Sequence, residues 1–243
     1  MNLINSLLAK QKKLHFTLID PENQTPKDAG RRAAACAGYG TDAIMVGGST
    51  VKDGGLVYRT VDAIKKSANV PTILFPNSAH ALSENADYVF FMMLVNCLDR
   101  RLLLGEQVKG APLINKWGIK PISMGYIVVS MSKEPTTVEK AAGLDRIGAG
   151  DIEKAVSYAL TAKYLNMECI YLEAGSGAEK PVPDEMISAV KNAAEIPIIV
   201  GGGIRDAKCA KDKTNAGADA IVSGTVSERD CGKIKGIIDA IKR

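Results

Sequence analysis

Short apolar runs recur along the chain and are separated by longer amphipathic stretches. Polar and apolar residues do not alternate within the runs, which is typical of strands covered on both faces of a parallel sheet. Eight runs have this character, at residues 14–19, 43–46, 72–75, 88–93, 122–129, 169–172, 198–200 and 220–223. Between them, apolar positions spaced three and four apart predict helices, most clearly over residues 152–163, 186–194 and 234–241.

Eight strands with helical crossovers predict a closed (β/α)₈ TIM barrel, and a doubly wound open sheet is the alternative. The length of 243 residues suits one barrel of roughly 250 residues, so we expect a single domain over residues 1–243. Residues 76–87 are too few for a helix and two loops, so the third helix should be missing or vestigial. Residues 130–151 are long and predict a mobile loop with an extra helix over residues 136–144.

The composition excludes several classes of function. Hydrophobic residues are 46% and charged residues 24%, which excludes a disordered chain. The net charge of +4 suits anionic small substrates, and without a long Lys/Arg run we expect no nucleic-acid partner. Five scattered cysteines without a CxxC pair, and only two histidines, argue against a zinc site or disulfides and indicate a cytoplasmic protein. The longest apolar run, 88–98, is about half a membrane span, which leaves peripheral membrane contact open.

Glycine-rich segments follow the last three predicted strands. They contain Gly175 and Gly177, then Gly202 and Gly203, then Gly224 with Thr225. Loops after the strands of such a barrel form its active site, and those after the seventh and eighth strands are the usual phosphate site. Glycines let successive backbone N–H groups approach an anion, so three such loops predict a phosphate cradle. The alternative is that the glycines only make tight turns.

Acidic and hydroxyl side chains follow other strands. Asp20 and Ser49 end the first and second strands, and one carboxylate with one hydroxyl suits Mg²⁺, which keeps several waters and prefers hard oxygen ligands. The alternatives are an Asp-Pro turn starter at Asp20 and a helix N-cap at Ser49. Glu173 ends the sixth strand beside the predicted cradle, where it could take a proton from an alcohol. Its alternative is a carboxylate satisfied by loop amides. Phe91 and Met93, with Tyr126 on the next strand, are first of all barrel core and could also floor an apolar groove.

Six segments together resemble the geranylgeranylglyceryl phosphate synthase family, including its PcrB-like bacterial relatives. They are HFTLIDPE, GTDAIMVGGST, PTILFPNS, YLEAGSGA, VGGGIRD and ADAIVSGT, and they span most of the chain. LIDPE and YLEAGSG carry the discrimination, because GGGIR and the final GT occur in many phosphate-binding barrels. The DPE form and the long middle region are closer to the archaeal-type second group, whose members often form dimers or hexamers.

The resemblance implies a prenyltransferase on a barrel that lacks its third helix. Such an enzyme transfers a geranylgeranyl group from geranylgeranyl diphosphate to the 3-hydroxyl of sn-glycerol 1-phosphate, which makes the first ether bond of archaeal lipids. Asp20 and Ser49 match the magnesium ligands, and Glu173 matches the glutamate that binds or deprotonates the hydroxyl. The glycerol 1-phosphate site matches Tyr171, Leu172, Glu173, Ala174, Gly175, Ser176, Gly177, Gly202, Gly203, Gly224 and Thr225. The apolar groove of Tyr126, Phe91 and Met93 would hold the prenyl chain, and its exposure favours a homo-oligomer.

One position departs from the bacterial members, which carry a lysine two residues before the aspartate where this chain has Leu18. Mg²⁺ and other cations must then meet the charge of the diphosphate. Two further functions remain open from the residues themselves. A phosphosugar isomerase or epimerase could use Asp20 and Glu173 as an acid/base pair, although Ser49 would then be idle. A phosphometabolite-binding barrel without turnover could keep the cradle alone, which the presence of both carboxylates argues against.

Overall fold

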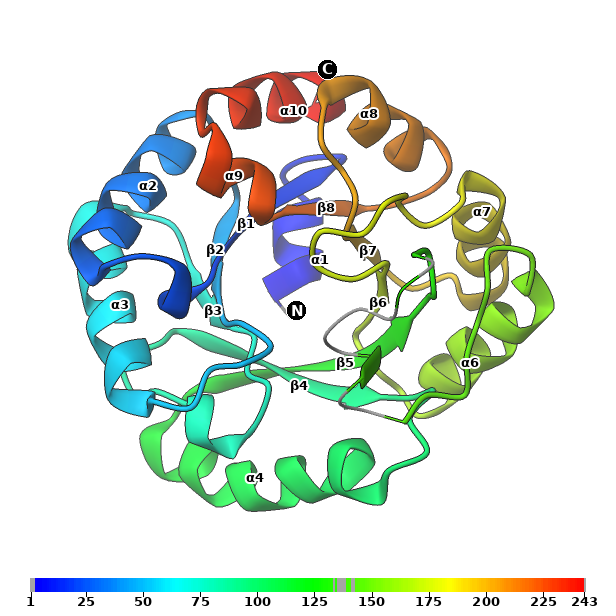
Figure 1. Cartoon of the computed structure of the whole chain (residues 1–243), viewed down its shortest axis with the longest axis horizontal. Coiled ribbons are helices and arrows are strands. Elements are labelled where there is room, and N and C mark those ends of the chain that lie inside the picture. Colours follow the sequence, from blue (N-terminus) through cyan, green and yellow to red (C-terminus); the bar gives the residue numbers. More distant parts are fainter. Residues whose placement is uncertain (1–2, 133, 135–138, 141–142, 243) are drawn as a thin grey trace.

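The computed structural model describes residues 3–132, 134, 139–140 and 143–242, and in it eight parallel strands close into a barrel in chain order (Figure 1). β8 pairs with β1, so the predicted closed barrel is confirmed and the open sheet is excluded. The strands are β1 (Leu14–Ile19), β2 (Ala43–Val46), β3 (Thr72–Leu74), β4 (Tyr88–Leu94), β5 (Lys120–Val128), β6 (Cys169–Glu173), β7 (Ile198–Gly201) and β8 (Ala220–Ser223).

Helices surround the barrel, except that the short α1 (Leu3–Leu8) contributes to its interior core (Figure 1). The outer helices are α2 (Pro26–Gly38), α3 (Gly54–Ser67), α4 (Glu106–Trp117), α6 (Ile152–Tyr164), α7 (Asp184–Ala194), α8 (Ala207–Asn215) and α10 (Gly232–Lys242). α9 (Thr225–Arg229) lies between α10 and the barrel axis. In the part of the chain that is described, no helix is long and apolar enough to cross a membrane.

Successive strand residues point to opposite sides of the barrel wall and form two separate cores. On β4, Phe90 joins the interior core with Phe16 and Tyr171, whereas Val89 joins the core between the strands and the outer helices. Because both faces of each strand are covered, the strands read in the sequence as unbroken apolar runs.

The third strand is followed by no α-helix, as predicted from the short connection. β3 and β4 are joined by loops and a single turn of 3₁₀ helix, η2 (Ala79–Ala81), all within described residues. α4 follows β4 and a π-helical turn, η3 (Arg101–Gly105), and it packs against η2. The flank of the barrel between β3 and β4 is therefore covered by η2 and α4, next to α3. Most of the helix expected over residues 136–144 falls outside the described residues.

The side chain of Asn96, which follows β4, forms hydrogen bonds with the end of β5. Its side chain is fully buried, and its Nδ2 donates to the carbonyl oxygens of Val128 at 3.0 Å and Asp145 at 3.2 Å. Its Oδ1 accepts a hydrogen bond from the backbone N–H of Val128 at 3.1 Å. A polar side chain inside the longest apolar run thus completes the hydrogen bonding of a strand end.

We expect Asn96→Ala to lower the free energy of unfolding by about 2–3 kcal/mol, because it leaves buried backbone groups unpaired. Urea denaturation measures the change. The exposed Asn115 on α4 is the matched control, and Asn115→Ala should change stability by less than about 0.5 kcal/mol. A loss for Asn96→Ala no larger than that of the control would contradict the interpretation.

Candidate active site

A cavity of about 520 Å³ opens at the carboxyl ends of the strands and continues toward α4. This volume lies within the range of pockets that bind small molecules. The residues following β1, β2, β6, β7 and β8 all line it, which brings together the candidates that the sequence places at separate strand ends. Tyr171, Glu173, Gly175, Ser176, Gly177, Gly202, Gly203, Gly224 and Thr225 line one part of the cavity, and Asp20 and Ser49 another.

The loops after β6 and β7 are in direct contact at the glycines. Gly175 and Gly202 have φ angles of +98° and +83°, which favour glycine. A Cβ placed on Gly202 would lie 2.8 Å from the backbone nitrogen of Gly175 and 2.5 Å from Oε1 of Glu173. A side chain at Gly202 would therefore push the two loops apart and displace the carboxylate. The arrangement exposes the backbone of Gly175 and Gly202 at the cavity wall, where a phosphate would bind.

Two members of the predicted glycerol phosphate site do not face the cavity. The side chains of Leu172 and Ala174 are fully buried in the core between strands and helices. They alternate with Tyr171 and Glu173, so the pleat of β6 turns them outward. Only their backbone remains close to the loop, and the N–H of Ala174 donates to the carbonyl of Gly201 at 3.0 Å.

Glu173 is a buried carboxylate held by three hydrogen-bond donors. Its Oε1 accepts from the backbone N–H of Gly175 at 2.5 Å, and the hydroxyls of Tyr171 and Tyr126 also donate to the carboxylate. Burial raises the pKa of Glu173 to about 7, and the three hydrogen bonds act in the opposite direction by favouring the charged form. The loop amide thus does contact the carboxylate, yet the side chain remains poised to exchange a proton near neutral pH.

An aromatic cluster surrounds this carboxylate. The rings of Phe75 and Tyr171 stack with centroids 5.5 Å apart, and Tyr126 meets both edge-on at 5.6 and 5.4 Å. Burial, followed by the neighbouring Glu173, raises the pKa values of both tyrosines well above the usual range, so their hydroxyls stay protonated donors. Tyr126 lines the cavity, and it does so beside Glu173 rather than out along the flank.

Asp20 and Ser49 follow β1 and β2, so they lie next to the glycine loop after β8 and farther round the strand ring from those after β6 and β7. Oδ1 of Asp20 accepts from the N–H of Glu22 at 2.9 Å and caps a short 3₁₀ turn, so Asp20 also starts a turn. A Cβ on Gly48 would overlap the Asp20 carboxylate, which means that this glycine lets the carboxylate approach the second loop. Ser49 is exposed and caps no helix, because α3 begins later with Asp53 as its N-cap.

The electrostatics around Asp20 favour a cation. Burial raises the pKa of Asp20, the hydrogen bond from Glu22 opposes this, and the charges of Glu228 and Glu22 raise it further. Among the described residues no cluster of three acidic, histidine or cysteine side chains could enclose a metal. Asp20 and Ser49 could supply two hard oxygen ligands to a cation such as Mg²⁺, whose other ligands would be water or a bound anion.

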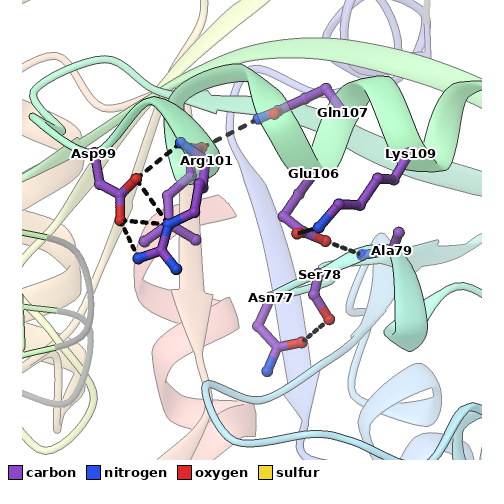
Figure 2. Close-up of polar contacts among 9 residues, drawn as sticks. Asn77, Ser78, Ala79, Asp99, Arg101, Glu106, Gln107 and Lys109 are labelled. Atoms are coloured by element: carbon purple, nitrogen blue, oxygen red, sulfur yellow. Dashed lines mark hydrogen bonds and ion pairs between the residues drawn. The ribbon is translucent and has the colours of Figure 1, made fainter.

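The cavity continues through the barrel wall where the third helix is missing. Leu82, Val89, Phe91 and Ile114 line this extension, which passes between η2 and α4. Figure 2 shows what holds its two sides together: Glu106 on α4 accepts the backbone N–H of Ala79 at 2.9 Å and the ammonium of Lys109 at 2.6 Å. We call this apolar extension the flank groove.

The predicted groove residues are divided by the structure. Phe91 lies in the flank groove, whereas Met93 does not line the cavity. Met92 lines the cavity instead, because its side chain alternates with that of Met93 along β4.

Further polar residues that sequence reasoning did not single out line the cavity, among them Asn77, Arg205, Arg229 and Lys233. Asn77 donates to the carbonyl oxygens of Ser49 at 3.0 Å and Val51 at 3.1 Å, and so holds the second loop. Asn77 belongs to the segment PNS directly after the third predicted strand, and this position at a strand end could have identified it as a candidate site residue. Arg229 and Lys233 follow the last strand by several residues, so no strand-end pattern pointed to them.

Comparison with known proteins matches nearly the whole chain. The model of the PcrB family matches residues 7–243. A geranylgeranylglyceryl phosphate synthase of Methanosarcina acetivorans is 49% identical over 244 residues, which cover 98% of this chain and 97% of that protein.

Two solved structures are similar over the full length. Wild-type GGGPS from Thermoplasma volcanium has a TM-score of 0.93 and 41% identity, covering 100% of this chain and 98% of that one. The (S)-3-O-geranylgeranylglyceryl phosphate synthase of Thermoplasma acidophilum, in complex with its substrate sn-glycerol-1-phosphate, has a TM-score of 0.94 and 37% identity, covering 100% and 99%.

The raised pKa of Glu173 makes a prediction about stability. A folded carboxyl that keeps its proton up to about pH 7, while the unfolded one loses it near its usual value of about 4.5, binds more protons when folded. Relative to Glu173→Gln, the wild-type free energy of unfolding should therefore fall as pH rises from about 4.5 to 7, by about 3 kcal/mol. Urea unfolding from pH 4.5 to 8 measures this difference. The exposed Glu185 on α7 supplies the control Glu185→Gln, and an equally flat difference for both variants would refute the assignment.

Proposed function

Since the chain belongs to the PcrB family, we propose that it is a prenyltransferase that makes geranylgeranylglyceryl phosphate. It transfers the geranylgeranyl group of geranylgeranyl diphosphate to the 3-hydroxyl of sn-glycerol 1-phosphate and releases diphosphate. The observation that carries the proposal is the placement of Glu173 between the glycine loops and an apolar groove that leaves the barrel. That placement supplies an anion cradle, a base and a tail site in one cavity.

The acceptor is held at its phosphate and deprotonated at its hydroxyl. The glycine loops after β6, β7 and β8 bind the phosphate, which orients the 3-hydroxyl toward Glu173. The hydroxyl oxygen bonds to the first carbon of the prenyl group, the bond from that carbon to the diphosphate breaks, and Glu173 takes the hydroxyl proton. A base with a pKa of about 7 suits this step near neutral pH. The hydroxyls of Tyr126 and Tyr171 keep the carboxylate in place.

The donor is held at both ends. Asp20 and Ser49 would hold Mg²⁺, which when bound supplies Lewis-acid stabilisation to the leaving diphosphate. Asn77 keeps the second loop in position by its two hydrogen bonds to backbone oxygens. The prenyl tail lies in the flank groove, where each buried CH₂ group contributes about 0.8 kcal/mol. Both other functions that the residues left open lack a use for this groove.

Two expectations about partners belong to the same proposal. Leu98 and Val108, next to η3 and on α4, are 74% and 63% exposed, and apolar surface of this kind supports association into a dimer or hexamer or contact with a membrane surface. We expect a homo-oligomer, which light scattering of the purified protein measures directly.

The test of the function is product formation. The protein is incubated with Mg²⁺, sn-glycerol 1-phosphate and a series of prenyl diphosphates of increasing length, and the products are identified by mass spectrometry. A geranylgeranyl ether of glycerol phosphate, lost on addition of EDTA, is expected. Glycerol 3-phosphate is the matched acceptor control. Turnover of a phosphosugar in EDTA, or binding without any product, would support the other two functions.

Asp20→Asn should lower turnover by about 10²–10³, because the variant loses the only acidic group predicted to ligate Mg²⁺. Acceptor binding, measured by calorimetry with sn-glycerol 1-phosphate, should be unchanged. Asp62→Asn, at an exposed ion pair with Lys66 on α3, is the control and should retain full turnover. Near-normal turnover of Asp20→Asn at limiting Mg²⁺ would exclude the assigned role.

Tyr126→Phe should move the midpoint of the acidic limb of kcat/KM to higher pH. In the wild type, the hydrogen bond from the Tyr126 hydroxyl lowers the pKa of Glu173. Without this hydrogen bond, burial raises that pKa further. The acceptor phosphate also ionises near pH 6, but it does so equally with both proteins, so only the displacement of the midpoint is diagnostic. Tyr158→Phe is the control, since that phenol bonds Asp145 at 2.7 Å. A midpoint that stays in place for Tyr126→Phe would disprove the contact.

Gly110→Leu should raise the donor KM by roughly tenfold and leave the acceptor KM unchanged. A Cβ at Gly110 would already lie 3.1 Å from Cδ1 of Leu82 across the flank groove, and overpacking costs about 1–3 kcal/mol. Steady-state kinetics with each substrate varied in turn measures the effect. Gly236→Leu on α10, where no atom lies within 4 Å of a built Cβ, is the control. A rise in acceptor KM instead would place the tail elsewhere.

A further inference from the structure

Two cationic side chains at the rim of the cavity have no acidic partner. Arg229 ends α9, Lys233 lies in the first turn of α10, and both line the cavity. About half of the other described lysines and arginines form ion pairs, but within the described residues neither of these two does. Unpaired cations lining a pocket are available to bind an anionic group.

The nearby carboxylates are already engaged by other donors. Oε1 of Glu228 accepts from the amide of Asn23 at 3.1 Å, and Oδ1 of Asp230 accepts from the backbone N–H of Gly232 at 3.0 Å. These two acids flank Arg229 in the sequence and also line the cavity, yet their hydrogen bonds go to the β1 loop and to the start of α10 and not to either cation. The cations are thus left for a ligand.

This segment lies next to Asp20. α9 packs against β1, and Figure 1 shows it on the inner side of α10. The charge of Glu228 contributes to the raised pKa of Asp20, and Asn23 of the loop after β1 bonds Glu228 directly. Arg229 and Lys233 are therefore at the same side of the cavity as the predicted magnesium ligands.

The cavity wall beside Asp20 carries an apolar side chain, Leu18, and not a cation. Leu18 lines the cavity on the strand that ends before Asp20, and its Cδ2 lies 3.5 Å from a Cβ built on Gly224. Asp20, Glu22 and Glu228 make this region acidic, while a diphosphate ester carries more negative charge than one Mg²⁺ neutralises. Binding the donor here requires further positive charge from the protein.

We propose that Arg229 and Lys233 form the cationic half of a diphosphate-binding subsite, at the same side of the cavity as Asp20 and Ser49. The proposal rests on the proposed function, because the diphosphate is that of the prenyl donor. A guanidinium can bind two oxygens of a phosphate at once, and the ammonium adds a point charge. The glycine loops then bind the acceptor phosphate. α9 lies between the two anion sites, because its first residue, Thr225, belongs to the acceptor phosphate site and its last, Arg229, to the diphosphate subsite.

Binding of inorganic diphosphate tests the subsite without turnover. Calorimetry in the presence of Mg²⁺ should give a Kd about tenfold or more higher for Arg229→Gln/Lys233→Gln than for wild type. The Kd for sn-glycerol 1-phosphate should stay within about twofold. Lys235→Gln, on the same helix but paired with Asp239 at 2.9 Å, is the control and should bind diphosphate as wild type does. Arg229→Lys/Lys233→Arg keeps both charges and should retain most of the affinity.

Three outcomes would overturn the inference. Unchanged diphosphate affinity in the double Gln variant leaves the two cations without the proposed role. Weaker binding of sn-glycerol 1-phosphate alone would assign them to the acceptor phosphate. Equal losses in the double Gln variant and the charge-retaining variant would indicate structural damage instead of lost charge. The wild-type product assay decides the proposed function separately, since failure to form a prenyl ether does not depend on these variants.

Discussion

The hydrogen bonding of β8 to β1 is the constraint on which the rest of the molecule depends. Closure leaves no sheet edge and forces the carboxyl ends of all eight strands into one ring. Asp20 and Gly224 are about 200 residues apart in the chain, yet they follow neighbouring strands and line one cavity. In a doubly wound open sheet of the same elements, the first and last strands would not be neighbours.

The missing third helix turns this closed scaffold into one that can accommodate a long apolar group. A barrel interior is filled by side chains, here by residues such as Phe16 and Phe90, and leaves no room for a C₂₀ chain. With η2 in place of a full helix after β3, the cavity extends over Val89 and Phe91 toward α4. Glu106 reaches across to η2 and defines the distance between the two sides of the flank groove.

Opposite electrostatic environments divide the cavity. Glu173 lies in a dry aromatic surrounding, where burial raises its pKa and tyrosine hydroxyls limit the increase. Asp20 lies at a wetter rim among other carboxylates, which makes that region attractive to cations. A carboxylate that titrates near neutral pH and a carboxylate whose surroundings favour a cation are thus produced from similar side chains by their environments alone. The glycines of the loops carry no charged side chains and contribute only backbone dipoles.

The sequence by itself determined which segments are strands and that the third helix is missing or vestigial, because periodicity and loop length are local properties, and it favoured a closed barrel over an open sheet. It also placed Asp20, Ser49, Glu173 and the glycine loops at strand ends, and the family motifs lie in these same segments. Only the tertiary structure decided which side chains turn inward: Leu172 and Met93 face away from the cavity, since the register of the pleat is set by packing on both faces. The hydrogen bond of Tyr126 to Glu173 and the proximity of Glu228 to Asp20 join residues 47 and 208 positions apart. Such contacts depend on how the strands and helices meet in space, which no local pattern of residues records.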